Sequence, residues 1–455
     1  MTELVQQNLT ALAKMIQSRE VSPVEVVEAH LKQIEEVNPG VNAIVTLAPD
    51  SLAQARVAEK IVREGGSIGL LRGLPITIKD TIETEGLRST SGSPVRANYV
   101  PLRDAPAVAL LKKAGAIIIG KTNPAEMAMD YTADNPVFGR TNHPQDASLT
   151  PGGSSGGEAA AIASFMSPGG IGSDLAGSVR VPAHFCGVAG LRPTVGRVPG
   201  GGQFPAASGP YSLGSVIGPM ARNVEDLQLL FRVLASQSLV QEKVKLAGVS
   251  VAWFTDDSVA PVSTETADAV RGAAETLSKA GLPTKQSRPP GLERGNELWL
   301  RLFSRTTVVV LRSVYAGREQ EGGDFVRWRL ATADDVPAPS LDEYIQSWVQ
   351  RDELREALLN WMQDTPLIVS PVGATAAVPH DTLKVEAGGK TIGMFRAFSY
   401  AQAFTVFDLP VAVVPAGRTK EGLPIGVQIA GRPFEEETVM AAAQIIEESF
   451  RRSEQ

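Results

Sequence analysis

Hydrophobic positions along the chain follow two alternating patterns. In one pattern, apolar residues recur at helical spacing as far as Ile34. A helix-start signal with a capping box lies at the beginning of this stretch, formed by Ser22, Pro23 and Glu25. Between such stretches lie short, uninterrupted apolar runs that are typical of buried strands: PITI before Lys79, AIII, PLIVSPVG, LPVAVVPAG and LPIGVQIA. Strands that alternate with helices in this way predict an α/β fold layered around a central sheet.

The pattern also predicts individual elements. Residues 1–20 predict one mixed polar helix, 42–66 a strand, a turn and a helix, and 105–129 a helix, a strand and a second helix. The stretch between 244 and 367 is mainly helical, with one strand at VSVAWF, and the chain ends in a strand and a helix. Because there is no internal repeat or low-complexity linker, we expect a single domain over residues 1–455, with a mainly helical insert at 244–366.

Composition argues against several classes of partner. Of the 455 residues, 43% are hydrophobic and 20% are charged, and the formal net charge is −7, as in an ordinary globular protein. There is no basic block and no apolar stretch near the roughly 20 residues of a membrane span, so we expect neither nucleic acid nor membrane as a partner. The N-terminus lacks the apolar core of a signal peptide and Cys186 is the single cysteine, which together predict a cytoplasmic protein.

Histidines are few, namely His30, His143, His184 and His380. Neither HExxH nor CxxC spacing occurs, so we expect no metal site. Because histidines are so few, a serine–histidine triad also has few candidate residues.

Residues 149–165 form a glycine- and serine-rich loop that leads into a helix, LTPGGSSGGEAAAIASF. One interpretation is a phosphate-binding loop, but the lysine of that motif is missing and Glu158 in the first helical turn would repel a phosphate. Another is the nucleophile elbow of α/β-hydrolases, because GGSSG matches G-x-S-x-G. That elbow must follow a strand, whereas the preceding RTNHPQDASLTP predicts a loop.

A third interpretation combines this loop with two other features. A short strand at GGIG is followed by a second glycine turn that carries Ser178, and Lys79 ends an apolar strand upstream. A buried ammonium is costly unless it is paired or deprotonated, and a deprotonated lysine can act as a general base. Taken singly, a Gly-Ser loop is usually a turn, Ser178 a helix cap and Lys79 solvent-exposed, but their combination favours catalysis.

At these residues the sequence resembles the amidase signature family, whose members hydrolyse amides with a Ser–cisSer–Lys triad. The detailed match runs from Gly73 to Asn223 and the remainder follows in outline. The matching segments are GLPITIKDTIETEG, GAIIIGKTNPAEMAM, NPVFGRTNHP, PGGSSGGEAAAIA, GIGSDLAGSVRVPAHFCGVAGLRPT and LPIGVQIAGRPFEEET. The resemblance implies a central mixed sheet covered by helices on both faces, and a reaction that needs no metal or organic cofactor.

Carried over position by position, the resemblance implies roles for three reactive residues. Lys79 matches the catalytic lysine, Ser154 the bridging serine that follows a cis peptide bond, and Ser178 the acylating nucleophile. The remaining site positions that it implies are the oxyanion-hole amides of Leu175, Ala176 and Gly177, and the supporting residues Ser155, Asp174 and Arg180.

The sequence departs from the family pattern at two positions, Ala176 and Asp408, where relatives usually carry glycine. Alanine at position 176 is compatible with a negative φ and disfavours a positive one. The activity therefore remains expected, whereas the shape of the oxyanion turn is in question.

The resemblance leaves several activities open. We expect a stand-alone amidase, a monomer or homodimer, that acts on small amides and anilides or on related esters and aryl carbamates, as a urethanase does. The alternatives are the amidase component of a glutamyl-tRNA(Gln) amidotransferase, which needs partner subunits, a fatty-acid amide hydrolase and a non-catalytic scaffold. Met129 and Tyr131 are candidate substrate-binding residues and equally candidates for the core, and the insert at 244–366 is expected to shape the rest of the pocket.

Overall fold

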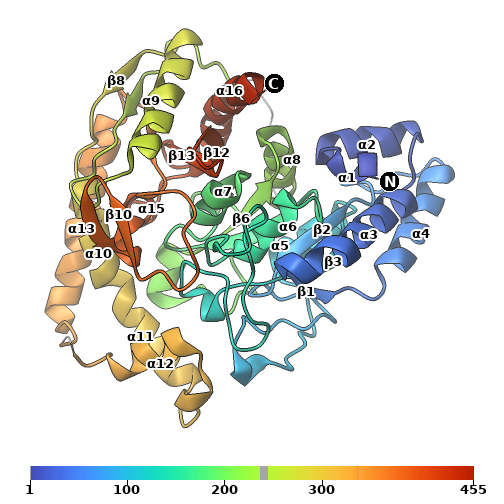
Figure 1. Cartoon of the computed structure of the whole chain (residues 1–455), viewed down its shortest axis with the longest axis horizontal. Coiled ribbons are helices and arrows are strands. Elements are labelled where there is room, and N and C mark those ends of the chain that lie inside the picture. Colours follow the sequence, from blue (N-terminus) through green and yellow to red (C-terminus); the bar gives the residue numbers. More distant parts are fainter. Residues whose placement is uncertain (1, 236–243, 336, 455) are drawn as a thin grey trace.

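The computed structural model describes residues 2–235, 244–335 and 337–454, and a single mixed sheet of eleven strands runs through its centre (Figure 1). The strand order is β1-β3-β2-β4-β6-β5-β12-β13-β9-β7-β8. The strand bounds are β1 Ile44–Leu47, β2 Pro75–Lys79, β3 Ile117–Thr122, β4 Gly169–Asp174, β5 Ala189–Arg192, β6 Val216–Ala221, β7 Val251–Trp253, β8 Thr284–Gln286, β9 Leu367–Pro371, β12 Val411–Arg418 and β13 Pro424–Ala430.

Parallel and antiparallel pairs coexist in this sheet. Strand β2 lies between β3 and β4 and is parallel to both. Each neighbouring pair in the next part of the sheet is antiparallel, in the order β4, β6, β5, β12, β13 and β9. Strand β2 is therefore an interior strand, with neighbours on both sides and every residue buried. The predicted α/β fold with a mixed sheet is confirmed.

Helices cover both faces of the sheet, as alternate residues of β12 show. Ala412 and Val414 join one hydrophobic cluster, and Val411 and Val413 join another. Adjacent strand residues point to opposite faces, so the two clusters are the two sides of the sheet. The first cluster includes helices α2 Leu9–Ser18, α5 Pro106–Lys113, α8 Val224–Leu234, α9 Thr264–Lys279 and α16 Glu436–Glu454; the second includes α6 Gly156–Ala163, α7 Arg180–Cys186, α10 Gly295–Trp299 and α15 Ser399–Val406.

Several of the remaining helices also contribute to the core: Val27 and Ile34 pack with Ile117 and Ile119 of β3 in a third cluster, and Leu358 and Ala397 join the second. Figure 1 shows α11 and α12 at the lower edge of the view and the small β10–β11 hairpin beside α15. No helix within the described ranges has the length and apolar character needed to cross a lipid bilayer. The bounds of these elements are α1 Thr2–Gln6, α3 Pro23–Val41, α4 Ser51–Arg63, α11 Arg305–Val314, α12 Asp324–Ala331, α13 Leu341–Trp361, β10 Lys384–Ala387, β11 Lys390–Gly393 and α14 Met394–Ala397.

Local sequence signals account for several helix starts. The predicted capping box at Ser22 is present, since Ser22 Oγ accepts from Glu25 N at 3.1 Å and Glu25 Oε2 accepts from Ser22 N at 2.7 Å. Asn223 caps α8 in a similar way through its side-chain oxygen. Both contacts satisfy amide groups that have no partner inside the helix.

Three sequence predictions about individual elements are wrong. The N-terminal stretch forms two helices rather than one, because Asn8 caps a new helix and accepts from Ala11 N. The helix predicted after Pro124 is only a 3₁₀ turn, Glu126–Ala128, in which Met127 and Ala128 have φ of 56° and 57°. A second short strand, β8, accompanies β7 between residues 244 and 366 and extends the edge of the main sheet.

Candidate active site

Lys79 ends strand β2 on the face that α6 and α7 cover. Ile76 and Ile78 join the cluster on the opposite face, so Thr77 and Lys79 point toward α6. The Lys79 side chain is fully buried. Its Nζ donates to Ser154 Oγ at 2.7 Å and to Ser173 Oγ at 3.1 Å. The structure thus brings together two of the three reactive residues that the sequence predicts.

The environment of Lys79 favours a neutral amine. Burial lowers its pKa from the ordinary value to about 7, although the negative charges of Asp174 and Glu158 act in the opposite direction. A lysine with this pKa is partly deprotonated at neutral pH and can accept a proton.

The Gly-Ser loop passes close to neighbouring backbone. A Cβ added at Gly153 would lie 2.0 Å from Thr132 O, which is a severe steric clash, so only glycine fits at this position. The Gly153–Ser154 peptide bond is cis, in line with the resemblance. Ser154 is fully buried and its hydroxyl faces Lys79. The glycines therefore allow the chain to carry a hydroxyl into a space that a side-chain-bearing backbone could not enter.

Ser155 connects this loop to the second glycine turn. Its N–H donates to Ser178 O at 3.1 Å, and its hydroxyl donates to Ser173 O at 3.3 Å. Ser154 and Ser178 are thereby held on adjacent turns. Ser178 is 7% exposed whereas Ser154 and Lys79 are 0% exposed, so all three residues are buried and Ser178 keeps the largest exposed fraction.

The backbone of the second turn shows whether alanine at position 176 must adopt a positive φ. The positive φ of this turn, +113°, belongs to Gly177, and Ala176 is not among the residues with positive φ. Alanine is therefore accommodated at 176. A Cβ at Gly177 would lie 2.8 Å from Ala401 Cβ, so glycine is needed there for space as well.

Asp174 and Arg180 brace this turn as a buried ion pair. Arg180 donates to both carboxylate oxygens of Asp174, at 2.9 and 3.0 Å, and to Ala401 O and Thr405 Oγ1 on α15. Gly177 N also donates to Asp174, at 2.9 Å. Burial alone would raise the Asp174 pKa, but the Arg180 charge and its hydrogen bonds lower it to about 2.

Tyr131 lies against the turn, whereas Met129 packs elsewhere. The Tyr131 hydroxyl donates to Ala176 O at 2.7 Å and accepts from Gln402 Nε2 at 3.0 Å. Burial raises the pKa of Tyr131, so its hydroxyl remains a donor. Met129 is partly buried and packs against a cluster with Tyr315 on the α11–α12 side.

Aromatic residues that the sequence did not single out surround the same turn. Trp299 Nε1 donates to Leu175 O at 2.9 Å, and the Trp299 ring lies 5.0 Å from that of Phe395. The Tyr131 ring lies 4.4 Å from Phe398. Trp299 and Phe395 come from α10 and α14, and Phe398 lies between α14 and α15, all more than 100 positions away from the turn in sequence. No local motif marks them, so only the tertiary structure could find them.

Asp408, the other departure from the family pattern, has a structural role. Its φ is +51°, a conformation that suits the glycine of relatives and that aspartate tolerates better than most residues. The carboxylate accepts from Arg192 Nη2 at 3.3 Å and from Val195 N at 3.0 Å. The fully buried Arg192 therefore has a counter-charge that glycine could not supply.

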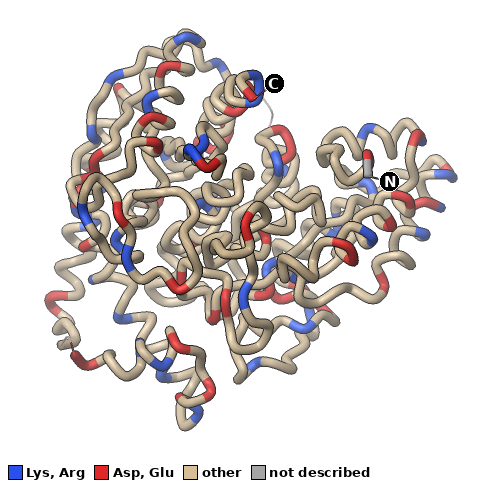
Figure 2. Tube along the Cα trace, in the orientation of Figure 1, with Lys and Arg blue, Asp and Glu red and all other residues tan. Residues whose placement is uncertain are grey.

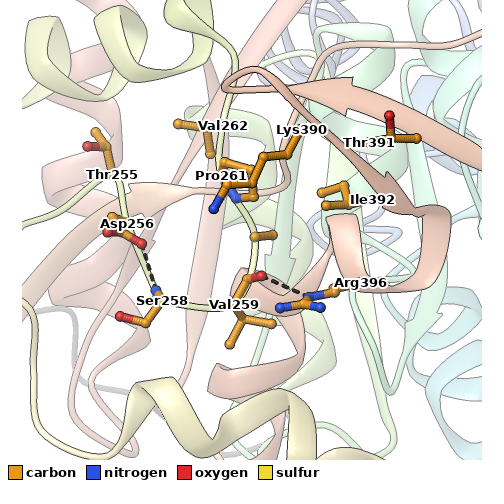
Figure 3. Close-up of a pocket in the computed structure, with 11 residues that line it drawn as sticks. Thr255, Asp256, Ser258, Val259, Pro261, Val262, Lys390, Thr391, Ile392 and Arg396 are labelled. Carbon is orange, nitrogen blue, oxygen red and sulfur yellow. Dashed lines mark hydrogen bonds between the residues drawn. The ribbon is translucent and has the colours of Figure 1, made fainter.

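A separate hollow of about 660 Å³ lies between the 255–262 loop and the β10–β11 hairpin with α14 (Figure 3). Arg396 Nε donates to Val259 O at 2.8 Å along one wall. Neither Lys79, Ser154 nor Ser178 is among the described residues that line it. Within the described ranges, no group of three or more His, Cys, Asp or Glu side chains is placed to hold a metal ion.

Known proteins match this chain along nearly its whole length. A family model described as Amidase matches residues 25–440. The indoleacetamide hydrolase of Bradyrhizobium diazoefficiens is 34% identical, over 96% of this chain and 85% of that protein. A glutamyl-tRNA(Gln) amidotransferase subunit of a Sulfurihydrogenibium species is 30% identical, over 97% of this chain and 96% of that one. The crystal structure of an amidase, 26% identical, has a TM-score of 0.88 and covers 98% of this chain and 100% of its own.

Replacing Arg180 tests the brace under the second turn. We expect Arg180→Ala to lower the free energy of unfolding by about 3–5 kcal/mol, because Asp174 would be left buried without its counter-charge. Urea denaturation followed by circular dichroism measures this change. Arg271→Ala is the matched control, since Arg271 pairs with Asp268 at the surface and such pairs contribute about 0–1 kcal/mol. Equal effects of the two substitutions would contradict the assignment.

Proposed function

The chain belongs to the amidase signature family and is a hydrolase of amide carbon–nitrogen bonds, and we propose that Ser178 is its nucleophile, with Ser154 and Lys79 as proton relay. The observation that supports this assignment most is the 2.7 Å contact between buried Lys79 and Ser154. This contact places a potential base next to the hydroxyl of Ser154. The following residue, Ser155, donates a backbone hydrogen bond to Ser178 O, which keeps Ser154 close to the proposed nucleophile.

In the proposed reaction, protons move from the nucleophile toward the lysine. As Ser178 Oγ attacks the substrate carbonyl, its proton passes to Ser154 Oγ, and the Ser154 proton passes to neutral Lys79. The carbon–nitrogen bond then breaks, and the relay returns a proton to the departing amine. Water repeats the sequence on the acyl-enzyme, which releases the acid and restores Ser178. Every proton is carried by the protein's own groups, so the proposal requires no cofactor.

The backbone of the second turn is the proposed oxyanion hole. We assign this role to the N–H groups of Leu175, Ala176 and Gly177, and the Gly177 amide would share its hydrogen between the oxyanion and Asp174. The carbonyls of Leu175 and Ala176 are already held by Trp299 and Tyr131. Fixing these carbonyls orients the peptide planes before substrate arrives, which is how preorganised donors stabilise a developing charge.

The proposed substrates are small, neutral and largely apolar or aryl amides, anilides and aryl carbamates. The support is the group of rings at the oxyanion turn, in which Phe395 is 36% exposed and therefore available for contact. Apolar pockets with few polar groups favour such ligands. The insert at 244–366 remains a candidate for the rest of the pocket and already supplies Trp299, whereas Met129, which packs toward Tyr315, is a weaker candidate than Tyr131.

Two other activities are weaker alternatives. The glutamyl-tRNA(Gln) amidotransferase relative has 30% identity, but a protein with that role would work with partner subunits and a nucleic-acid substrate. Basic and acidic residues are interspersed along the trace rather than gathered by sign in the view of Figure 2, and the net charge is −7, which would not attract tRNA. A non-catalytic scaffold is disfavoured because Lys79, Ser154 and Ser178 are all present. We propose that the protein acts alone in the cytoplasm, as a monomer or homodimer.

The role of Ser178 can be tested by removing its hydroxyl. We expect Ser178→Ala to lower kcat at least about 10⁴-fold and to abolish labelling by a fluorophosphonate, because no acyl-enzyme can form. Intact-mass spectrometry measures the labelling. Ser18→Ala, on the exposed side of α2, is the control and should label fully. Labelling of the Ser178→Ala protein would assign the nucleophile elsewhere.

The role of Lys79 predicts the pH dependence. Below its pKa of about 7 the amine is protonated and cannot accept a proton, so kcat/KM should fall about tenfold per pH unit below pH 7. Above that value the amine is neutral and kcat/KM should level off. The measurement is a pH profile on an anilide, recorded with and without EDTA. A flat profile from pH 5 to 8 would contradict a lysine base, and EDTA inhibition reversed by zinc would contradict a metal-free reaction.

Substrate preference separates the stand-alone amidase from its alternatives. We expect the purified chain alone to hydrolyse p-nitroacetanilide and an aryl carbamate faster than glutamine, because aryl groups fit the ring cluster and leave more readily. Release of p-nitroaniline, phenol and ammonia measures the three reactions. Hydrolysis of glutamine only, or activity only with two partner subunits, would favour the amidotransferase.

A further inference from the structure

A buried carboxylate that the proposed mechanism does not use lies beside the lysine. Glu158, in the first turn of α6, is fully buried. Its Oε1 accepts from Thr77 Oγ1 at 2.5 Å and its Oε2 accepts from Thr122 Oγ1 at 2.7 Å. A glutamate is seldom buried without a partner, so its position calls for a physical reason.

The two threonines place this carboxylate against Lys79. Thr77 lies two residues before Lys79 on the same face of β2, and Thr122 on β3 is the residue paired with Lys79 in the sheet. Strand β4 leaves room for the carboxylate, because a Cβ added at Gly170 would lie 2.0 Å from Glu158 Oε1. Two strands, a glycine and a helix thus form a compartment for one negative charge next to the lysine.

The other buried charges around Lys79 already have partners. Arg180 pairs with Asp174 on β4, and Arg192 on β5 pairs with Asp408. On β3, Lys121 donates to Ile82 O, Thr84 Oγ1 and Ser89 Oγ, with the carboxylate of Asp80 as its principal opposite charge. Of the two carboxylates that act on Lys79, Asp174 has the larger effect but is paired with Arg180. Glu158 is instead held by threonine hydroxyls, and Lys121 acts on it as well as Lys79.

The two histidines and the cysteine on the adjoining helices carry no charge at neutral pH, and the charged residues of α3 are exposed to solvent: Glu25, Glu28, Lys32, Glu35 and Glu36. His30 on α3, which packs against β2, has its pKa lowered to about 4 by burial. His184 on α7, which packs against α6, has its pKa lowered to about 4 for the same reason. Burial raises the pKa of the Cys186 thiol. These groups therefore do not change the charge that Lys79 and Glu158 experience between pH 5 and 8.

We propose that Glu158 is a positioning residue whose charge sets the pH at which Lys79 becomes a neutral base. This inference rests on the proposed function of Lys79. Ionised Glu158 stabilises the ammonium form of Lys79, and protonated Glu158 releases that stabilisation through space, without a direct proton transfer between them. Burial raises the Glu158 pKa to about 7, against the threonine hydrogen bonds and the lysine charges that lower it, so both groups titrate in the same range.

The test is the acidic limb of the kcat/KM profile in Glu158→Gln. Glutamine keeps the size of the side chain and removes its charge, so the Lys79 pKa should fall and the limb should move to lower pH by about one unit. Thr122→Val is a second variant that keeps the glutamate but removes one donor to its ionised form. We expect a smaller shift in the same direction, and this variant decides the matter if Glu158→Gln does not fold.

Glu447→Gln is the matched control. Glu447 on α16 is also buried, and burial raises its pKa to about 7, but its partners are Val224 N and Arg451 rather than the lysine compartment. The acidic limb of the kcat/KM profile of Glu447→Gln should stay at the pH of the unsubstituted protein. A lower kcat with an unmoved limb in both test variants would overturn the inference and reduce Glu158 to a structural residue. Full activity of Lys79→Met would instead overturn the proposed function itself, so the two failures are distinguishable.

Discussion

The site depends on burying the side-chain amine of Lys79 inside the layer between the sheet and α6. An ammonium in such a place is penalised by several kcal/mol unless opposite charges and hydrogen bonds offset the loss of water. Here two serine hydroxyls contact Nζ directly and the nearest carboxylates stand further off. The compensation is therefore incomplete, and the pKa falls to about 7 instead of staying near that of an exposed lysine. A closer carboxylate would have kept the lysine permanently charged and unable to accept a proton.

Glycines on β4 make this arrangement possible. Besides the space that Gly170 leaves for Glu158, a Cβ at Gly172 would lie 2.6 Å from Ser155 Oγ. The α6 end of the Gly-Ser loop can thus lie directly on the strand, which brings Ser155 within reach of Ser173 O and Ser178 O. The glycines in the sequence are explained by close approach as much as by turn conformation.

Sequence reasoning succeeded where the relevant contacts are local or where a motif is contiguous. The capping box at Ser22 and the buried strand that ends at Lys79 follow directly from residue pattern. It failed at Met127 and Ala128, where helix-favouring residues adopt positive φ because tertiary contacts outweigh a small intrinsic preference. The rings of Trp299 and Phe395 were missed for a related reason, since their elements are distant in sequence and carry no motif. Glu158 was noticed only as a residue unfavourable to phosphate, because its partners lie on two strands that the sequence does not show to be neighbours.

The choice of basic residue at each buried position fits its task. Arginine keeps its charge at any physiological pH and can donate to both oxygens of a carboxylate, as Arg180 does with Asp174. That permanence suits a brace, which must not weaken while the reaction proceeds. Lysine is a compact charge whose pKa responds strongly to burial, so the position at the end of β2 can alternate between two protonation states. An arginine at position 79 would hold its proton throughout and could not relay one, which makes lysine the residue whose chemistry matches the hydroxyl of Ser154 beside it.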